Sequence, residues 1–264
     1  MNLNQKKFRT FYLSLFFIIL YVPVLSVVLY SFNKSSSTAY WAGFTLNWYK
    51  ELFNDRVILE AFNVSIKVAL LTALLSAIVG TASAITSVYV TKKTEKTTNG
   101  LMFLPLIVPE VALGVSLLIF FSALKLPFGT FTLVISHSLF CVPYVYIMVQ
   151  LRLKEINISI IEAAKDLGAT RGQIIKTIIL PLVMPSTLTA SLLALAMSLD
   201  DVIISTYMAG PTTTTLPVHI FSMMRVGVTP KVNALCTLFL VGTFFLIGIN
   251  QIIGTKGGKF FEQK

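Results

Sequence analysis

Long apolar stretches separated by short polar segments are the dominant pattern along this chain. Six of them are long enough for membrane-spanning α-helices, which need about 20 mostly apolar residues. None shows the alternating segments of about ten residues that form strands of a membrane barrel. The pattern therefore predicts an all-α, polytopic membrane protein with six transmembrane helices, near residues 10–32, 62–90, 101–124, 128–151, 178–204 and 232–253.

The third apolar stretch has an unusual interior. It contains Pro105-Leu106-Ile107-Val108-Pro109-Glu110, which places two prolines and a carboxylic acid at the expected depth of the membrane. Such backbone is costly where a helix faces lipid, and it is tolerated where it lines a cavity or packs against protein. We therefore expect this segment to line a cavity or to pack against protein.

The composition fits a membrane protein. The 264 residues are 55% hydrophobic and 12% charged, with a mean hydropathy of +0.82, whereas soluble domains carry about 25% charged residues. The net charge of +10 would also suit nucleic-acid binding, but the basic residues follow the predicted topology. Most lie on one side of the membrane: Lys6, Lys7, Arg9, Lys92, Lys93, Lys96, Arg152, Lys154, Lys165, Arg171, Lys176, Lys256, Lys259 and Lys264. The positive-inside rule then predicts cytoplasmic termini and no nucleic-acid partner.

The longest cytoplasmic loop, residues 152–177, has the chemistry of a helical hairpin. Two capping boxes are expected to start its helices, Ser159 with Glu162 and Thr170 with Gln173. Gly168 lies between them and is able to end the first helix in the left-handed conformation. We expect the hairpin at about 155–177, with an apolar face on its first helix formed by Ile160, Ile161, Ala164 and Leu167. A hairpin that merely connects two spans would show the same pattern.

The segment from Glu162 to Pro181 resembles a known family. The family pattern is Glu-Ala-Ala, three residues, Gly, nine residues, Ile, one residue and Leu-Pro. The chain matches every position, with Glu162, Ala163, Ala164, Gly168, Ile178, Leu180 and Pro181. This pattern is typical of the permease subunits of binding-protein-dependent ABC importers. The resemblance extends over nearly the whole chain to the spermidine/putrescine importers, in segments that include 47–49, 198–202, 209–211, 216–217 and 226–228.

The resemblance implies a fold and a mode of coupling. The fold would be that of a type I ABC importer permease, with residues 1–264 as a single transmembrane domain and the core at about 60–254. The hairpin would insert into a cleft on a cytoplasmic ATPase. The coupling residues would be Glu162, Ala163, Ala164, Asp166, Gly168, Ile178, Leu180 and Pro181.

The resemblance also implies partners. A second permease subunit would complete a heterodimeric pore in the inner membrane of a bacterium, and a dimeric ATPase and a periplasmic polyamine-binding protein would complete the importer. The chain lacks the Gly-x-x-x-x-Gly-Lys-Ser/Thr phosphate loop. We therefore expect no enzyme activity and no cofactor in this chain, because the partner ATPase would bind ATP and Mg. No metal site is expected either, because no metal-ligand spacing relates Cys141, Cys236, His137 and His219.

Three acidic residues and one aromatic residue are candidates for the substrate path. Glu110, Asp200 and Asp201 are predicted at or near membrane depth, where a carboxylate costs about 2.5–3.5 kcal/mol and commonly serves function. These carboxylates would offset the lost hydration of a polycation, and Tyr207 would add cation–π attraction. In the alternative interpretation, the acids cap helix ends at the external interface or form ion pairs with Lys231 or Arg225.

The leading interpretation is the membrane-spanning subunit of an ATP-driven polyamine importer. One alternative is an ABC importer permease for another solute, such as iron, thiamine or sulfate. A second alternative, from a different class, is an ion-driven secondary carrier that works without an ATPase. A third is a membrane scaffold that binds partners through the hairpin but carries no flux.

Overall fold

The computed structural model describes residues 3–262, which are almost entirely α-helical. This confirms the all-α prediction. The elements are α1 (Leu3–Tyr30), α2 (Asn47–Asn54), α3 (Arg56–Ser87), α4 (Lys92–Ile107), α5 (Glu110–Ala123), α6 (Thr130–Glu155), α7 (Ile158–Asp166), α8 (Arg171–Ile174), η1 (Ile175–Ile179), α9 (Leu180–Asp200), α10 (Ile203–Met208), α11 (Leu216–Val226) and α12 (Pro230–Glu262).

Four helical runs among the described residues are long and apolar enough to cross a membrane. They are Phe11–Tyr30, Arg56–Ser87, Thr130–Glu155 and Arg171–Asp200. The last run joins α8, η1 and α9 without a break, so the second helix of the predicted hairpin is the start of a span. The chain is therefore a multi-pass membrane protein. A sixth span at 232–253, which falls within α12, and cytoplasmic termini remain predictions.

The third predicted span, 101–124, is not one straight helix. The chain bends by 104° between α4 and α5, so the expectation of a single continuous span was wrong. Pro109 causes the break, because a proline disfavours helical geometry in the residue before it. Val108 accordingly ends α4 in an extended conformation, with φ −70° and ψ 130°. α4 and α5 amount to a fifth span only if the bent pair is counted as one.

The described chain forms two compact units. One unit contains the residues up to Leu59 together with His219–Gly242. Within it, the indole nitrogen of Trp48 on α2 donates to the Asn33 carbonyl at 2.7 Å. An ion pair at 2.8 Å joins Lys231, near the start of α12, to Asp55 just before α3. The polar contacts of this unit therefore tie the segment after α1 to α2, and the start of α3 to α12.

The Asp55–Lys231 pair is expected to make stability depend on pH. The hydrogen bond from Lys231 lowers the pKa of Asp55 below its usual value. A lowered folded-state pKa contributes stability above the unfolded pKa of about 3.9, and this contribution is lost as pH falls through the folded pKa. We expect Asp55→Asn to cost about 0.2–1 kcal/mol at pH 7, as for other partly exposed pairs.

Thermal unfolding in detergent between pH 7 and pH 3 measures this effect. The wild-type and Asp55→Asn proteins should converge toward the acid end, while the exposed Glu60→Gln variant serves as the charge-matched control. A difference between wild type and Asp55→Asn that is equally large at both ends of the pH range would contradict the expectation.

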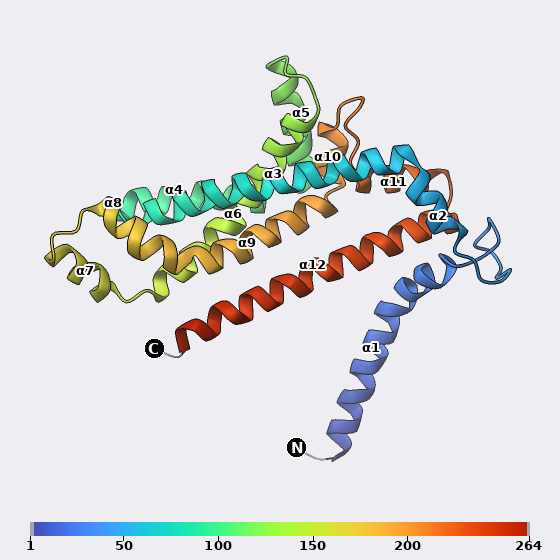
Figure 1. Ribbon diagram of the computed structural model, residues 1–264, viewed down its shortest axis with the longest axis horizontal. Helices are drawn as coiled ribbons and strands as arrows, with labels where there is room; N and C mark the ends of the chain where they lie inside the picture. The colour runs from blue at the N-terminus through green and yellow to red at the C-terminus, as the bar shows by residue number, and fades with distance from the viewer. Residues whose placement is uncertain (1–2, 263–264) are drawn as a thin grey trace. The chain divides into compact units, whose positions relative to one another are not determined.

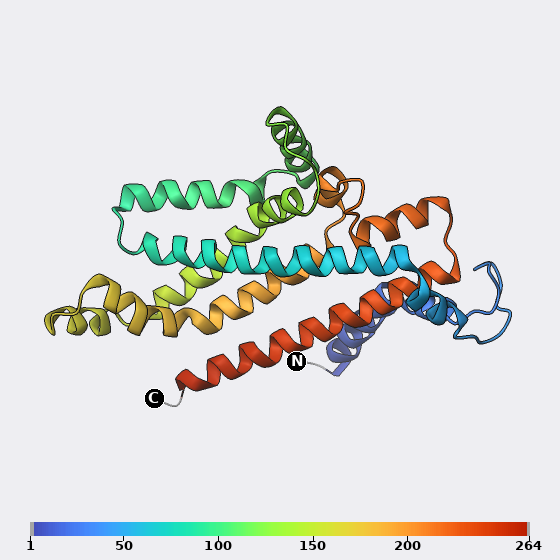
Figure 2. The same cartoon turned by 45° about the horizontal axis from the view of Figure 1, so that its top comes forward.

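The second unit contains Glu60–Val218 and the residues from Thr243 onward. Its centre is an antiparallel pair, α6 and α9, which lie alongside one another in both views (Figures 1 and 2). Three hydrogen-bond contacts mark their register: His137 with Ser198, Cys141 with the Ala194 carbonyl, and Arg152 with the Leu182 carbonyl. The two helices therefore remain in contact along nearly their whole length. α7 and α8 lie at one end of it (Figure 1).

Gly80 allows α3 to approach α6 closely. A Cβ atom at this position would lie 2.7 Å from the Val145 Cβ and 3.1 Å from the Tyr146 backbone nitrogen. We expect Gly80→Ala to lower the free energy of unfolding by about 1–3 kcal/mol, because the added methyl overpacks a buried contact. Gly100→Ala on α4 is the matched control, since its Cβ meets nothing within 4 Å. Unchanged thermal unfolding of Gly80→Ala in detergent would show that the contact tolerates the methyl.

Candidate functional site

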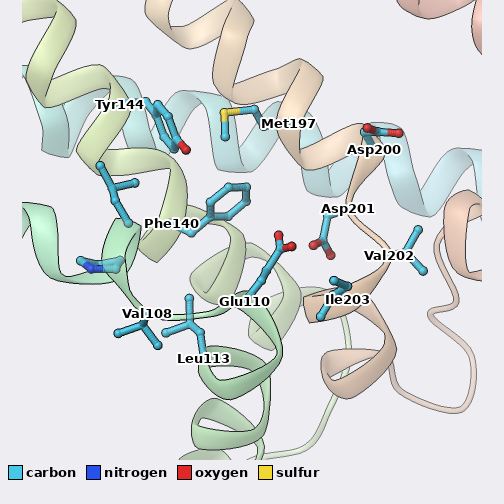
Figure 3. Close-up of a pocket in the computed structure, with 12 residues that line it drawn as sticks. Val108, Glu110, Leu113, Phe140, Tyr144, Met197, Asp200, Asp201, Val202 and Ile203 are labelled. Carbon is cyan, nitrogen blue, oxygen red and sulfur yellow. The ribbon is translucent and has the colours of Figure 1, made fainter. Parts of the chain in front are cut away.

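Two helix breaks in the second unit adjoin one cavity of about 600 Å³. The first break separates α4 from α5, and the second separates α9 from α10. Val108 and Glu110 line the cavity from the first break, and Asp200 and Asp201 line it from the second (Figure 3). The expectation that the proline-rich segment lines a cavity is therefore confirmed for Pro105, Leu106, Val108 and Glu110.

The structure brings all three predicted carboxylates to this cavity. Glu110 and Asp200 are exposed, whereas Asp201 is buried, with 6% of its surface accessible. The side chains of Glu110 and Asp201 point into the same part of the cavity (Figure 3). Two carboxylates that face the same space repel one another, and a cation placed between them would be attracted by both.

Tyr207, the predicted aromatic contributor, does not line the cavity. Its ring lies against Gly114 of α5, where a Cβ would come within 2.6 Å of it. Phe140 and Tyr144 on α6 line the cavity in its place. They are one helical turn apart, and their ring centroids are 6.3 Å apart in an edge-on arrangement. Their four-residue spacing in the sequence indicates that they share one face of a helix, but it does not show whether that face lines a cavity.

Asp201 has a structural role as well. Its carboxylate accepts hydrogen bonds from the backbone nitrogens of Ile204 at 3.3 Å and Ser205 at 2.6 Å, and so caps the start of α10. The predicted span 178–204 ends early, at Asp200, because the chain is extended at Asp201 and a new helix begins at Ile203. The imidazole of His137 also faces the Asp201 carboxylate, with Nε2 3.2 Å from Oδ2. The alternative of a helix cap is thus confirmed for Asp201, while pairing with Lys231 or Arg225 is not.

The two basic residues of that alternative have other partners. Lys231 pairs with Asp55, and the guanidinium of Arg225 lies 4.6 Å from the centroid of the Phe221 ring. The cavity carboxylates are therefore not neutralised by either of them.

The predicted hairpin is present as α7, a turn and α8. Gly168 has φ +80°, the left-handed conformation expected for it. Thr170 and Gln173 form the predicted capping box, with the Thr170 amide donating to the Gln173 side chain at 2.7 Å. The other predicted capping box was wrong. Asn157 caps α7 by accepting from the Ser159 amide at 3.1 Å, because the helix begins one residue before Ser159.

The hairpin divides its apolar side chains between two surfaces. Ile161 and Ala164 pack against the core cluster around Val145 and Ile174. Ile160 and Leu167 are 47% and 88% exposed, so only part of the predicted apolar side of the hairpin packs against the protein. Of the predicted coupling residues, the structure leaves five exposed on the hairpin or at the start of α9, namely Glu162, Ala163, Asp166, Gly168 and Pro181, and it partly buries Ala164, Ile178 and Leu180.

Comparisons with known proteins agree with this architecture. Residues 73–256 match the family described as binding-protein-dependent transport system inner membrane component. The chain is 37% identical over 237 residues to the spermidine/putrescine transport system permease protein PotC of Haemophilus influenzae, covering 90% of this chain and 92% of that protein. It is 40% identical over 253 residues to the putrescine transport system permease protein PotI of Escherichia coli K12, covering 92% and 89%.

A solved structure shows the same fold. It is a bacterial ABC transporter involved in the import of the acidic polysaccharide alginate, with a TM-score of 0.75 at 15% identity, and the match covers 97% of both chains. The protein is therefore a membrane permease with the type I ABC importer fold. It belongs to the family of binding-protein-dependent transport system inner membrane components.

Proposed function

We propose that this chain is a membrane-spanning subunit of an ATP-driven importer of polyamines, such as spermidine or putrescine, and forms half of its translocation pore. The observation that carries the proposal is the meeting of Glu110, Asp200 and Asp201 at one cavity next to spanning helices. Carboxylates at membrane depth cost about 2.5–3.5 kcal/mol on insertion scales and commonly mark ion or substrate pathways. The names of the PotC and PotI relatives support a polyamine as the cation.

The cavity suits an elongated, flexible polycation. Its carboxylates come from two separate helix breaks, so they can meet more than one ammonium group along a chain. Phe140 and Tyr144 line the same space, and each ring face attracts an ammonium group with about 0.5–2 kcal/mol. Leu113 and Ile203 supply apolar surface for the methylene segments between the charges.

The hairpin is the proposed contact with a cytoplasmic ATPase. Ile158, Ile160 and Leu167 are large apolar side chains that are 67%, 47% and 88% exposed. Exposed apolar side chains among charged neighbours such as Glu162 and Asp166 are typical of a protein-binding surface. The ATPase would be a dimer that binds ATP and Mg. A second permease subunit and a periplasmic polyamine-binding protein would complete the assembly in the bacterial inner membrane.

Reconstitution of the chain with these partners in liposomes tests the proposal. Spermidine or putrescine, delivered by the binding protein, should stimulate ATP hydrolysis and accumulate inside. Stimulation by iron, thiamine or sulfate alone would indicate an importer for another solute. Transport by the chain without an ATPase, driven by a proton or sodium gradient, would indicate a secondary carrier.

A further inference from the structure

A buried polar cluster includes one of the carboxylates that line the cavity. It consists of His137 on α6, Ser198 on α9, Asp201 at the break and Ser205 on α10. His137 and Ser205 are 0% exposed, Ser198 is 5% exposed and Asp201 is 6% exposed. The imidazole Nδ1 lies 2.7 Å from the Ser198 Oγ, and Nε2 lies 3.0 Å from the Ser205 Oγ and 3.2 Å from the Asp201 Oδ2. One ring therefore joins three helices to a cavity-lining carboxylate.

The partners of the His137 ring assign its tautomer. A carboxylate accepts hydrogen bonds and donates none, so Nε2, which faces Asp201, carries the proton. Nδ1 lies within hydrogen-bond distance of the Ser198 hydroxyl, which orients the ring from its other side. The Nε2–H group therefore donates toward Asp201 and holds the carboxylate in place.

The two oxygens of Asp201 differ in their surroundings. Oδ2 accepts from the Ser205 amide at 2.6 Å and also faces His137 at 3.2 Å. Oδ1 accepts a longer bond, from the Ile204 amide at 3.3 Å. Each carboxylate oxygen has two lone pairs, so Oδ1 retains accepting capacity while Oδ2 is occupied. Asp201 lines the cavity with a side chain that is 1% exposed, so Oδ1 is the oxygen with capacity left for a cation that contacts it there.

We infer that His137 is a positioning residue for cation binding: it holds Oδ2 of Asp201 against α6 so that Oδ1 stays directed at a primary ammonium group in the cavity. The inference rests on the proposed function, because it assumes that the cavity binds the transported cation. His137 itself does not touch the cation. Its effect is carried by the orientation of the Asp201 carboxylate.

Two substitutions separate this role from simple packing. The amide nitrogen of glutamine lies three bonds from Cβ, as Nε2 does, and that of asparagine lies two bonds away, as Nδ1 does. His137→Gln therefore keeps a donor toward Asp201, whereas His137→Asn keeps a polar group only toward Ser198. Loss of a charge-assisted hydrogen bond commonly changes affinity by about tenfold or more. We expect polyamine affinity to fall about tenfold in His137→Asn and to stay within about twofold of wild type in His137→Gln.

The measurement is equilibrium dialysis of radiolabelled spermidine and putrescine against the purified complex of both permease subunits and the ATPase. Equal amounts of assembled complex, determined by size-exclusion chromatography, are compared. Equal losses in the two variants, or no loss in either, would overturn the positioning role. If His137→Asn does not assemble, Ser198→Ala replaces it, since it removes only the hydroxyl that orients the ring. About threefold weaker binding by Ser198→Ala supports the role, and wild-type affinity overturns it.

Asp201→Asn distinguishes the proposed cation site in the cavity from the positioning role of His137. If this variant binds polyamine as wild type does, Asp201 is not part of the cation site and the role of His137 is overturned. If the wild-type complex binds no polyamine, the proposed cavity site itself fails. If Asp201→Asn weakens binding while both His137 variants bind normally, the cavity site stands and only the positioning role of His137 is overturned.

Discussion

Replacing Gly168 with aspartate is expected to leave the subunit in the membrane and to reduce substrate-stimulated ATP hydrolysis about tenfold or more. Gly168 has φ +80° at the turn between α7 and α8, and this conformation costs a residue with a side chain about 1–2 kcal/mol. The added Cβ would meet nothing within 4 Å, so the penalty arises from the backbone and not from a clash. Relief of the strain would move the exposed hairpin residues that are proposed to contact the ATPase.

Gly172→Asp is the matched control for this prediction. It introduces the same side chain four residues away, also into open space. Gly172 lies in the first turn of α8, where a negative charge is favourable to a helix. Equal uncoupling by both substitutions would show that charge, and not the turn, matters. Normal stimulation in Gly168→Asp would remove the basis for a coupling role of the turn.

Glu162→Lys tests the exposed face of the hairpin without altering its backbone. Glu162 is exposed on α7, so charge reversal should leave the fold intact and weaken contact with a partner surface that matches the wild-type charge. The expected result is again membrane insertion with loss of stimulated ATP hydrolysis. Lys93→Glu, a charge reversal at an exposed position on α4, is the control and should retain stimulation.

The double substitution Asp200→Asn with Asp201→Asn is expected to reduce polyamine uptake more than tenfold in the assembled importer. Both side chains line the cavity, and each lost charge–ammonium contact commonly costs about 1.5–3 kcal/mol. The single variants separate two causes. Asp200 is exposed and has no role in capping α10, so Asp200→Asn removes only charge, whereas Asp201→Asn also alters the cap of α10.

Uptake of radiolabelled spermidine into liposomes, normalised to assembled complex, measures the effect. Glu51→Gln, which neutralises an exposed acid on α2 outside the cavity, is the control and should transport normally. Uptake at the wild-type rate in the double variant would exclude these carboxylates from the path.

The sequence predicted most of the helices because apolar runs of spanning length leave few alternatives. The sequence-based prediction of helix starts failed where two neighbouring residues could each cap the same helix. Asn157 and Ser159 are both good caps two residues apart, and nothing in the pattern selects Asn157. The acids at the cavity were identified because their presence at membrane depth is itself unusual. Phe140 and Tyr144 were missed because the position of a residue along a span does not show which face of the span it occupies. Tyr207, which follows the predicted span 178–204, packs on Gly114 instead.

The break between α4 and α5 shows a second limit. Pro105 and Pro109 were both visible, yet the sequence did not indicate which of them ends a helix. Pro105 lies within α4, while Pro109 follows the break. A proline in the first turn of a helix is tolerated, and one inside a helix is commonly accommodated in membrane proteins by neighbouring groups. The outcome therefore depends on packing that a single sequence does not reveal.

The π-helical turn η1 changes the spacing of buried residues between the hairpin and the helix that follows it. Ile174, Ile179 and Val183 are all 0% exposed, so the buried positions are first five and then four residues apart. A spacing of five would rotate an ordinary α-helix by about 140° off its buried face at 100° per residue, but the wider turn absorbs the extra residue, with the Leu180 amide bonding the Ile175 carbonyl. The run Arg171–Asp200 is thus a single strut about 45 Å long at 1.5 Å per residue. The one additional residue in η1 therefore sets how α9, which ends at the cavity residue Asp200, is rotated relative to the hairpin.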